Sequence, residues 1–208
     1  MPQASVHRTP WAIIIAAVVI LIVLMAGCGT ALALLGGKTS SGTPDATPAA
    51  ASPAAFQGPT ASNPVVTVPV PAGWTVTAKD NESITLTDPN AWGYVTVASG
   101  VQNPKQNVQQ QKAIIDASIK SKSPDAIECR AVRPTPGTIG GVKGITWHLC
   151  FTVISSGKSL AAEASLFVAT NADGSVYYGV ILLTPQSYMT NLSREAEPLI
   201  AGIQWKLT

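Results

Sequence analysis

Residues 142–154 read VKGITWHLCFTVI and form the longest regular alternation in the chain. Large apolar side chains stand at every second position, at Ile145, Trp147, Leu149, Phe151 and Val153, with mostly polar residues between them. Successive side chains of a strand point to opposite faces of a sheet, so this pattern predicts a strand with one face in a hydrophobic core.

Shorter segments of the same kind surround this strand and predict a sheet. They are residues 65–70, 74–78, 83–87, 94–98 and 127–132 before it, and 160–170, 176–184 and 203–207 after it. One helix is expected between Asn103-Pro104 and Ser123-Pro124, and another over about 187–200, where Pro198 should kink it or begin a new turn. The glycine-rich residues 137–141 are expected to form a loop. The predicted fold class is α+β, an antiparallel sheet flanked by two helices.

Two cysteines lie on consecutive predicted strands. Cys129 and Cys150 are an even pair in a domain that we expect to be exported, which favours a disulfide over two buried thiols. Cys150 alternates away from Trp147, so the bond is expected on the opposite face of the sheet, near His148 and Thr152.

Residues 11–35 contain no charged side chain. As a helix they would extend about 37 Å, enough to cross a hydrocarbon core of about 30 Å with some tilt. We therefore expect a transmembrane signal-anchor helix, preceded by a short cytoplasmic tail, residues 1–10. Arg8 before the helix and the sparse basic residues after it favour an N-terminus inside the cell and an extracytoplasmic C-terminal domain.

Two alternatives for this segment remain open. Residues 24–28, LMAGC, resemble a bacterial lipobox, in which Cys28 would be lipidated and become the new N-terminus. Ala31-Leu32-Ala33 fits the small-x-small pattern of a cleaved signal peptide. The run is longer than a usual signal h-region, and it stays apolar beyond Cys28, so the uncleaved anchor is the favoured interpretation.

Residues 36–63 differ in composition from the rest of the chain. They are rich in Pro, Ala, Ser, Thr and Gly, a composition that cannot bury enough apolar surface to offset its ordering entropy, and we expect a linker. Residues 64–208 are the expected packed domain, of ordinary domain size.

Composition and motifs argue against several functions. The chain has 13 basic and 11 acidic residues, a near balance that disfavours nucleic-acid binding. His148 is the single histidine of the domain and stands in mid-strand without a nucleophile motif, so it is interpreted as structural or exposed. No P-loop, Rossmann or hydrolase motif is present, and no cofactor, metal site or enzymatic activity is expected.

The domain resembles a known family at three places. The opening Val68-Pro69-Val70-Pro71-Ala72-Gly73-Trp74 is similar to the strand–Pro-x-Gly-Trp opening of PsbP-like domains, which include LpqN-type envelope proteins. Two further segments are similar to PsbP-like domains. They are the glycine-rich residues 137–144, which lead into a pair of long strands, and residues 200–205 near the C-terminal end of the domain. The resemblance covers about residues 64–208 and implies an α/β/α sandwich around an antiparallel sheet. It implies no single activity, and no binding residue of the family can be placed on this sequence.

Together these features predict a membrane-anchored extracytoplasmic domain of the cell envelope that has a binding or accessory role. Its partners would be the membrane, through residues 11–35, and either an envelope protein or a small ligand. The alternatives are an envelope enzyme whose active site has no readable motif, a lipoprotein anchored through Cys28, and a purely structural domain. A concave apolar pocket would favour a small ligand or an enzyme, and a flat apolar patch would favour a protein partner.

Overall fold

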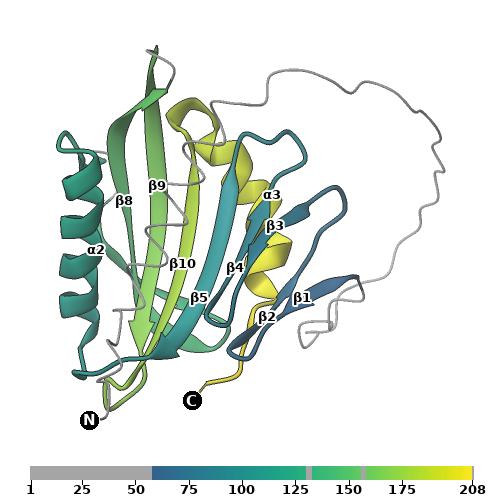
Figure 1. Ribbon diagram of the computed structural model, residues 1–208, viewed down its shortest axis with the longest axis vertical. Helices are drawn as coiled ribbons and strands as arrows, with labels where there is room; N and C mark the ends of the chain where they lie inside the picture. Colours follow the sequence, from purple (N-terminus) through teal and green to yellow (C-terminus); the bar gives the residue numbers. More distant parts are fainter. Residues whose placement is uncertain (1–57, 130–132, 156–157, 208) are drawn as a thin grey trace, which may run out of the picture.

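The computed structural model describes residues 58–129, 133–155 and 158–207 (Figure 1). The predicted tail, the anchor helix 11–35, Cys28 and residues 36–57 of the predicted linker lie outside the described residues.

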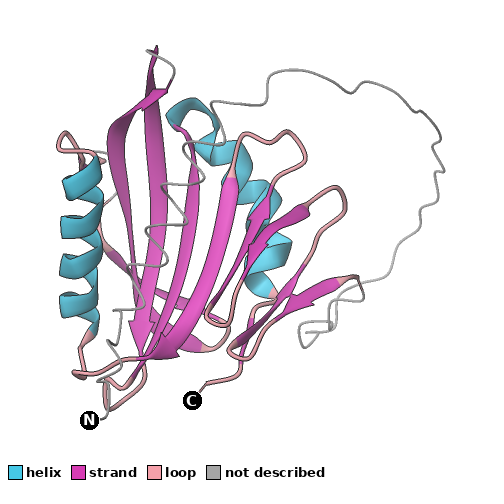
Figure 2. Cartoon of the chain, viewed as in Figure 1, coloured by secondary structure: helices cyan, strands magenta, loops and turns pink. Residues whose placement is uncertain are grey.

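A large antiparallel sheet occupies the centre of the domain (Figure 2). Its strands, in spatial order, are β3 (Thr75–Lys79), β4 (Ser83–Thr87), β5 (Tyr94–Val101), β10 (Val176–Pro185), β9 (Lys158–Thr170), β8 (Val142–Ser155) and β6 (Ile127–Glu128). An eighth strand, β7 (Thr135–Ile139), pairs with the first part of β8, while β6 pairs with Leu149 and Cys150 further along. The long strands β8, β9 and β10 therefore form a continuous surface in the middle of the sheet.

The two helices cover opposite faces of this sheet, as Figure 1 shows. Helix α2 (Val108–Lys122) places Ile115 in one core, together with Trp147 and Leu149 of β8. Helix α3 (Met189–Ala201), which follows a short 3-10 turn, η1 (Gln186–Tyr188), places Leu192 and Leu199 in the other core. The predicted arrangement of an antiparallel sheet flanked by two helices is confirmed. Among the described residues, neither helix is long and apolar enough to cross a membrane.

A second, three-stranded sheet joins the two ends of the described chain. Strand β2 (Val66–Pro69) lies between β1 (Thr60–Ser62) and β11 (Gln204–Trp205). The Lys206 ammonium donates hydrogen bonds to the Ser62 hydroxyl and to the Asn63 carbonyl, both at 2.6 Å. Strand β1 falls inside the range 36–63 that composition assigned to the linker, so ordered structure begins before residue 64.

Three predicted details were wrong. Helix α2 begins after Asn107, not at Asn103-Pro104, because Asn107 and Gln110 form a reciprocal capping box. The glycine-rich segment is not a loop throughout, since Thr135–Ile139 form β7 and only Gly140 and Gly141 form the turn, both with positive φ. Helix α3 continues through Pro198 to Ala201 as one element, so Pro198 does not begin a new turn.

Trp147 is fully buried on the α2 side of the sheet, as its alternation predicted. Its indole N–H donates to the Asp116 carboxylate at 2.9 Å, and the Lys112 ammonium lies 5.3 Å from the ring centroid. The buried indole therefore has its polar group satisfied from α2, which fixes that helix against β8.

Candidate functional site

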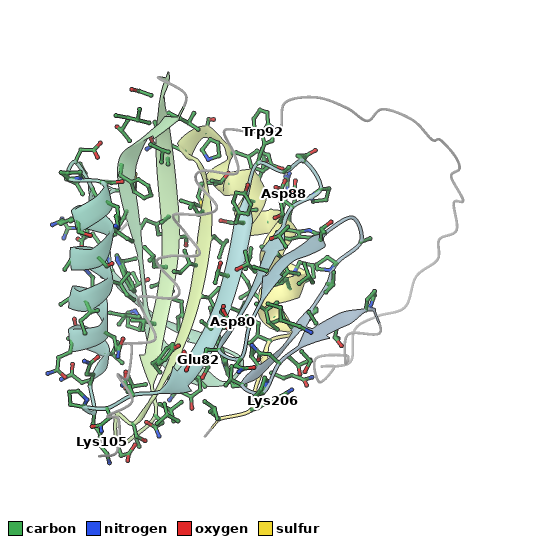
Figure 3. The ribbon with its side chains drawn as sticks, in the orientation of Figure 1. Asp80, Glu82, Asp88, Trp92, Lys105 and Lys206 are labelled. Carbon is green, nitrogen blue, oxygen red and sulfur yellow. A yellow bond between two sulfur atoms is a disulfide. The ribbon has the colours of Figure 1, made fainter. Side chains whose placement is uncertain are left out.

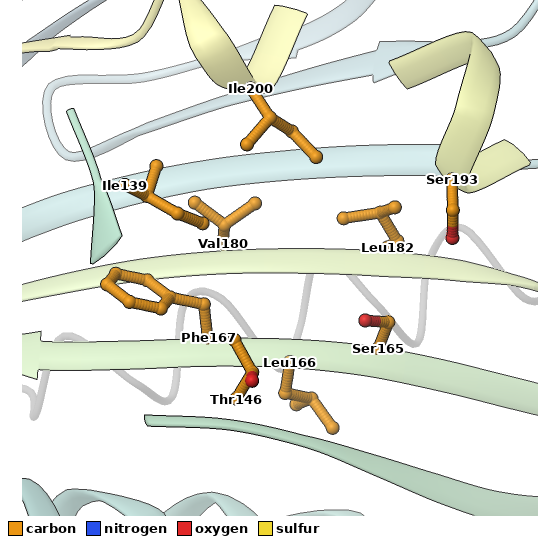
Figure 4. A pocket seen from close by; sticks show the side chains of 9 residues that line it. All are labelled: Ile139, Thr146, Ser165, Leu166, Phe167, Val180, Leu182, Ser193 and Ile200. Atoms are coloured by element: carbon orange, nitrogen blue, oxygen red, sulfur yellow. The ribbon is translucent and has the colours of Figure 1, made fainter. Parts of the chain in front are cut away.

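A groove lies on the α3 side of the sheet, with a volume of about 210 Å³ (Figure 4). Its floor consists of residues from β8, β9 and β10, and Ser193 and Ile200 of α3 form its far wall. The lining residues are Ile139, Thr146, Ser165, Leu166, Phe167, Val180, Leu182, Ser193 and Ile200. The lining is mostly apolar with three hydroxyl groups, a composition typical of small-ligand pockets.

Strand alternation explains why polar groups collect beside this groove. On β8, the residues opposite to the Trp147 face are Thr146, His148, Cys150 and Thr152. The register places His148 opposite Ser165 and Cys150 opposite Glu163 on β9. Two neighbouring strands therefore bring an imidazole, a hydroxyl and a carboxylate together on one face.

His148 is the centre of this polar group. Its Nδ1 lies 2.7 Å from Glu163 Oε1, and its Nε2 lies 3.3 Å from the Ser165 hydroxyl. The side chains of His148 and Glu163 are 20% and 12% exposed, so solvent reaches the group only in part. Ser165 belongs both to this group and to the groove lining, and so connects the two.

The disulfide borders the same group. Cys129 and Cys150 are bonded with their Cα atoms 5.2 Å apart, as the sequence predicted, and on the face opposite to Trp147. The Cys129 N–H donates to the His148 carbonyl at 3.1 Å. A carboxylate oxygen of Glu163 and the two sulfur atoms all lie within 4.8 Å of one another. Because the sulfur atoms are bonded to each other, they cannot serve as thiolate ligands for zinc.

The order Ser165–His148–Glu163 matches the nucleophile, base and orienting acid of acyl-transfer enzymes. Such enzymes also need N–H donors that stabilise a developing oxyanion. Strand β9 is paired with β8 on one side and β10 on the other around Ser165, so the backbone N–H groups there are used in the sheet. The arrangement can accept and donate hydrogen bonds to a ligand, but within the described residues the paired strands around Ser165 leave no backbone N–H group free for an oxyanion.

The sequence did not predict this site. His148 was interpreted as structural or exposed, and neither Ser165 nor Glu163 was singled out. The only signal in the sequence is that Glu163 and Ser165 are two residues apart on a predicted strand, as are His148 and Cys150. The strand register that brings the two pairs together depends on the hairpin between β8 and β9.

The fold is that of an antiparallel sheet between two helices, and solved structures with a similar arrangement exist. No family model matches the chain, and no curated protein matches it either. LpqN of Mycobacterium tuberculosis, described as involved in cell envelope biogenesis, is 14% identical over 73% of this chain and 87% of its own, with a TM-score of 0.38. Cyanobacterial PsbP from Synechocystis is 12% identical over 67% and 86%, with a TM-score of 0.42.

A protein of Bacteroides thetaiotaomicron is 15% identical and has a TM-score of 0.47. The match covers 73% of this chain and half of the length of that protein. The structural neighbours thus include PsbP and LpqN, the kinds of protein that the sequence resembles. At these values no function is transferred from any of them.

Proposed function

We propose that this chain is a membrane-anchored, extracytoplasmic domain of the cell envelope that binds a small ligand without transforming it. The observation that carries the binding function is the groove of about 210 Å³, which is mostly apolar and is joined through Ser165 to the polar His148 group. A ligand with an apolar part and a hydrogen-bonding end would match both regions.

The location is supported by two features of different kinds. The uncharged run 11–35 is long enough to cross a bilayer. The disulfide between Cys129 and Cys150 is typical of an oxidising compartment, which agrees with an N-terminus inside the cell and a domain outside it.

Fractionation tests the anchor. The full chain should stay in the membrane pellet after alkaline extraction, and external protease should digest the domain in intact cells or spheroplasts. Recovery of the full chain in the soluble fraction would contradict the anchor. Cys28→Ser separates the two membrane attachments, because a lipoprotein would lose its processing and a transmembrane helix would be unaffected.

Photo-crosslinking tests the groove. An alkyl probe that carries a diazirine, added to the full chain in vesicles, should label peptides of β9, β10 and α3. Ser193→Trp fills the groove from an exposed helix position and should abolish labelling there. The matched control is Arg194→Trp, one residue along the same helix and outside the groove lining, which should label as the unaltered chain does. Equal labelling in both variants would refute the groove as the binding site.

A hydrolase is the second candidate, and the contacts of His148 with Ser165 and Glu163 are the observation that favours it. A fluorophosphonate reagent modifies activated serines and would label Ser165 in such an enzyme, with the label lost in Ser165→Ala and kept in Ser193→Ala. We favour binding because the ladder around Ser165 leaves no backbone donor for an oxyanion. Specific labelling of Ser165 would reverse that preference.

A further inference from the structure

Trp92 stands apart from the other tryptophans that the structure describes. It belongs to the loop between β4 and β5, and it is 56% exposed. Trp74 and Trp147 are buried and Trp205 is partly buried. Tryptophan is enriched among the residues that contribute most to binding at interfaces, so an indole exposed to this extent is a candidate for recognition.

The loop holds Trp92 in a fixed position. The buried Asp88 carboxylate accepts hydrogen bonds from the backbone N–H groups of Trp92 at 2.8 Å and Gly93 at 2.6 Å. The Thr184 hydroxyl donates to the Trp92 carbonyl at 2.9 Å. Figure 3 shows Trp92 and Asp88 close to each other near one end of the sheet. These contacts fix the backbone of Trp92, so the loop that presents the indole is ordered before any partner arrives, which reduces the entropy lost on binding.

A second aromatic ring and a second carboxylate lie beside Trp92. The Tyr188 ring meets the Trp92 ring edge to face, with centroids 5.7 Å apart. The Tyr188 hydroxyl donates to Glu195 at 3.0 Å and accepts a hydrogen bond from the Asn90 amide at 2.9 Å. Burial raises the pKa of Tyr188 above its usual range, and the hydrogen bond to Glu195 and the charges of Asp88 and Glu195 add to this, while the hydrogen bond from Asn90 opposes it.

Two carboxylates, those of Asp88 and Glu195, lie beside these rings at the Tyr188 hydroxyl. Among the residues that the structure describes, no basic side chain lies within 4.0 Å of the carboxylate of Asp88 or of Glu195. Aromatic faces attract cations, and a carboxylate without a basic partner accepts hydrogen bonds from N–H groups. A purely apolar partner would instead cover Glu195 and remove its charge from water without compensation.

We propose that Trp92, Tyr188 and Glu195 form a binding site for a basic side chain of a peptide or protein partner. The cationic group stacks on the exposed face of Trp92 and donates its N–H groups to Glu195, while Asp88 adds a second negative charge behind the loop. Arginine suits the site because its flat guanidinium can stack and donate hydrogen bonds at the same time. None of Trp92, Tyr188 and Glu195 lines the groove, so the proposal does not rest on a ligand bound there.

Titration of the full chain in non-ionic detergent with Nα-acetylarginine amide tests the proposal. The ligand should change the tryptophan emission of the unaltered chain, and the change should disappear in Trp92→Ala. Nα-acetylcitrulline amide has nearly the same shape and no charge, so it should bind at least about tenfold more weakly. Equal binding of the two compounds would overturn the proposal, as would the absence of any change with the arginine compound.

Two variants of helix α3 distinguish an effect of the Glu195 charge at the site from an effect of the overall charge of the protein. Glu195→Gln should lower the affinity for the arginine compound by about fivefold or more, because it removes the charge that faces the ligand. Glu197→Gln removes an equal charge from an exposed position on the same helix and should leave the affinity unchanged. Circular dichroism checks that both variants are folded. An equal loss in the two variants would show a nonspecific charge effect and would refute the site.

Discussion

The two faces of strand β8 have different roles, although the residues on them alternate along the same strand. On the α2 side, Trp147 and Leu149 are buried in a core that α2 closes, and the indole N–H is bonded to Asp116. On the α3 side, His148 and Cys150 lie beside a groove and remain partly exposed. The difference teaches that a single strand can stabilise the fold with one face and present polar chemistry with the other, because its side-chain period is two.

The largest difference between the two faces should appear in the free energy of unfolding of Trp147→Ala. It removes a fully buried indole and takes the indole N–H donor from one oxygen of Asp116, whose other oxygen stays paired with Lys112, so the free energy of unfolding should fall by about 3–5 kcal/mol. Thr146→Ala, one position along and on the groove face, is the control and should change it by less than about 1 kcal/mol. Urea denaturation followed by circular dichroism measures both. An unchanged midpoint for Trp147→Ala would mean that the strand register is shifted by one.

Removing the disulfide should have the next largest effect, and it acts on the groove face. The bond closes a loop with a sequence separation of 21 residues, which corresponds to about 3 kcal/mol in the chain-entropy model. The paired variant Cys129→Ser, Cys150→Ser should unfold at a lower urea concentration and should no longer respond to reductant. Mass mapping without reduction should find the two cysteines in one cross-linked peptide pair. Two free thiols in exported protein would contradict both the bond and the extracytoplasmic location.

The smallest expected effect lies at the rim of the domain, where exposure weakens electrostatic contacts. The Lys105 ammonium lies 2.5 Å from Asp173 and, with the Ser175 hydrogen bonds, holds the pKa of that carboxyl well below its usual range. A carboxyl with a lowered folded pKa stabilises the protein above its unfolded pKa of about 3.9 and loses that contribution as the pH falls.

Asp173→Asn should therefore lower the melting temperature slightly at neutral pH, and this difference from the unaltered chain should shrink as the pH falls below about 4. Thermal melts at several pH values, compared with the exposed Glu197→Gln as control, measure this difference. A larger dependence on pH in Asp173→Asn would mean that the ion pair opposes folding.

The sequence predicted the sheet well where alternation was long and poorly where it was short. The burial of Trp147 and the face on which the disulfide lies followed from the alternation in β8, whereas the bond itself followed from the even pair of cysteines in a domain expected to be exported. Strand β7 was missed because Pro136 and Gly137 both disfavour strands, although an edge strand tolerates proline. Strand β1 was missed because its three residues have the composition of a linker, and only pairing with β2 makes them a strand.

The candidate sites depend on contacts that local patterns do not contain. His148 meets Glu163 and Ser165 only through the β8–β9 register. Trp92 meets Tyr188, 96 positions away along the chain, because β5 and β10 are neighbours in the sheet. The helix start was a local error, since Asn107 and Gln110 have the spacing of a capping box and Asn103-Pro104 does not.

The small sheet has a mechanical consequence. If the proposed anchor holds the chain at residues 11–35, any pull between the membrane and a partner on the domain enters through β1. From β1 the force passes to β2 and β11 and across the Lys206 contacts to Ser62 and Asn63 before it reaches the large sheet. Tension would detach a three-residue strand first, lengthening the tether while β8, β9 and the groove stay intact. The domain would thus have an attachment that lengthens under tension while its binding surfaces stay folded.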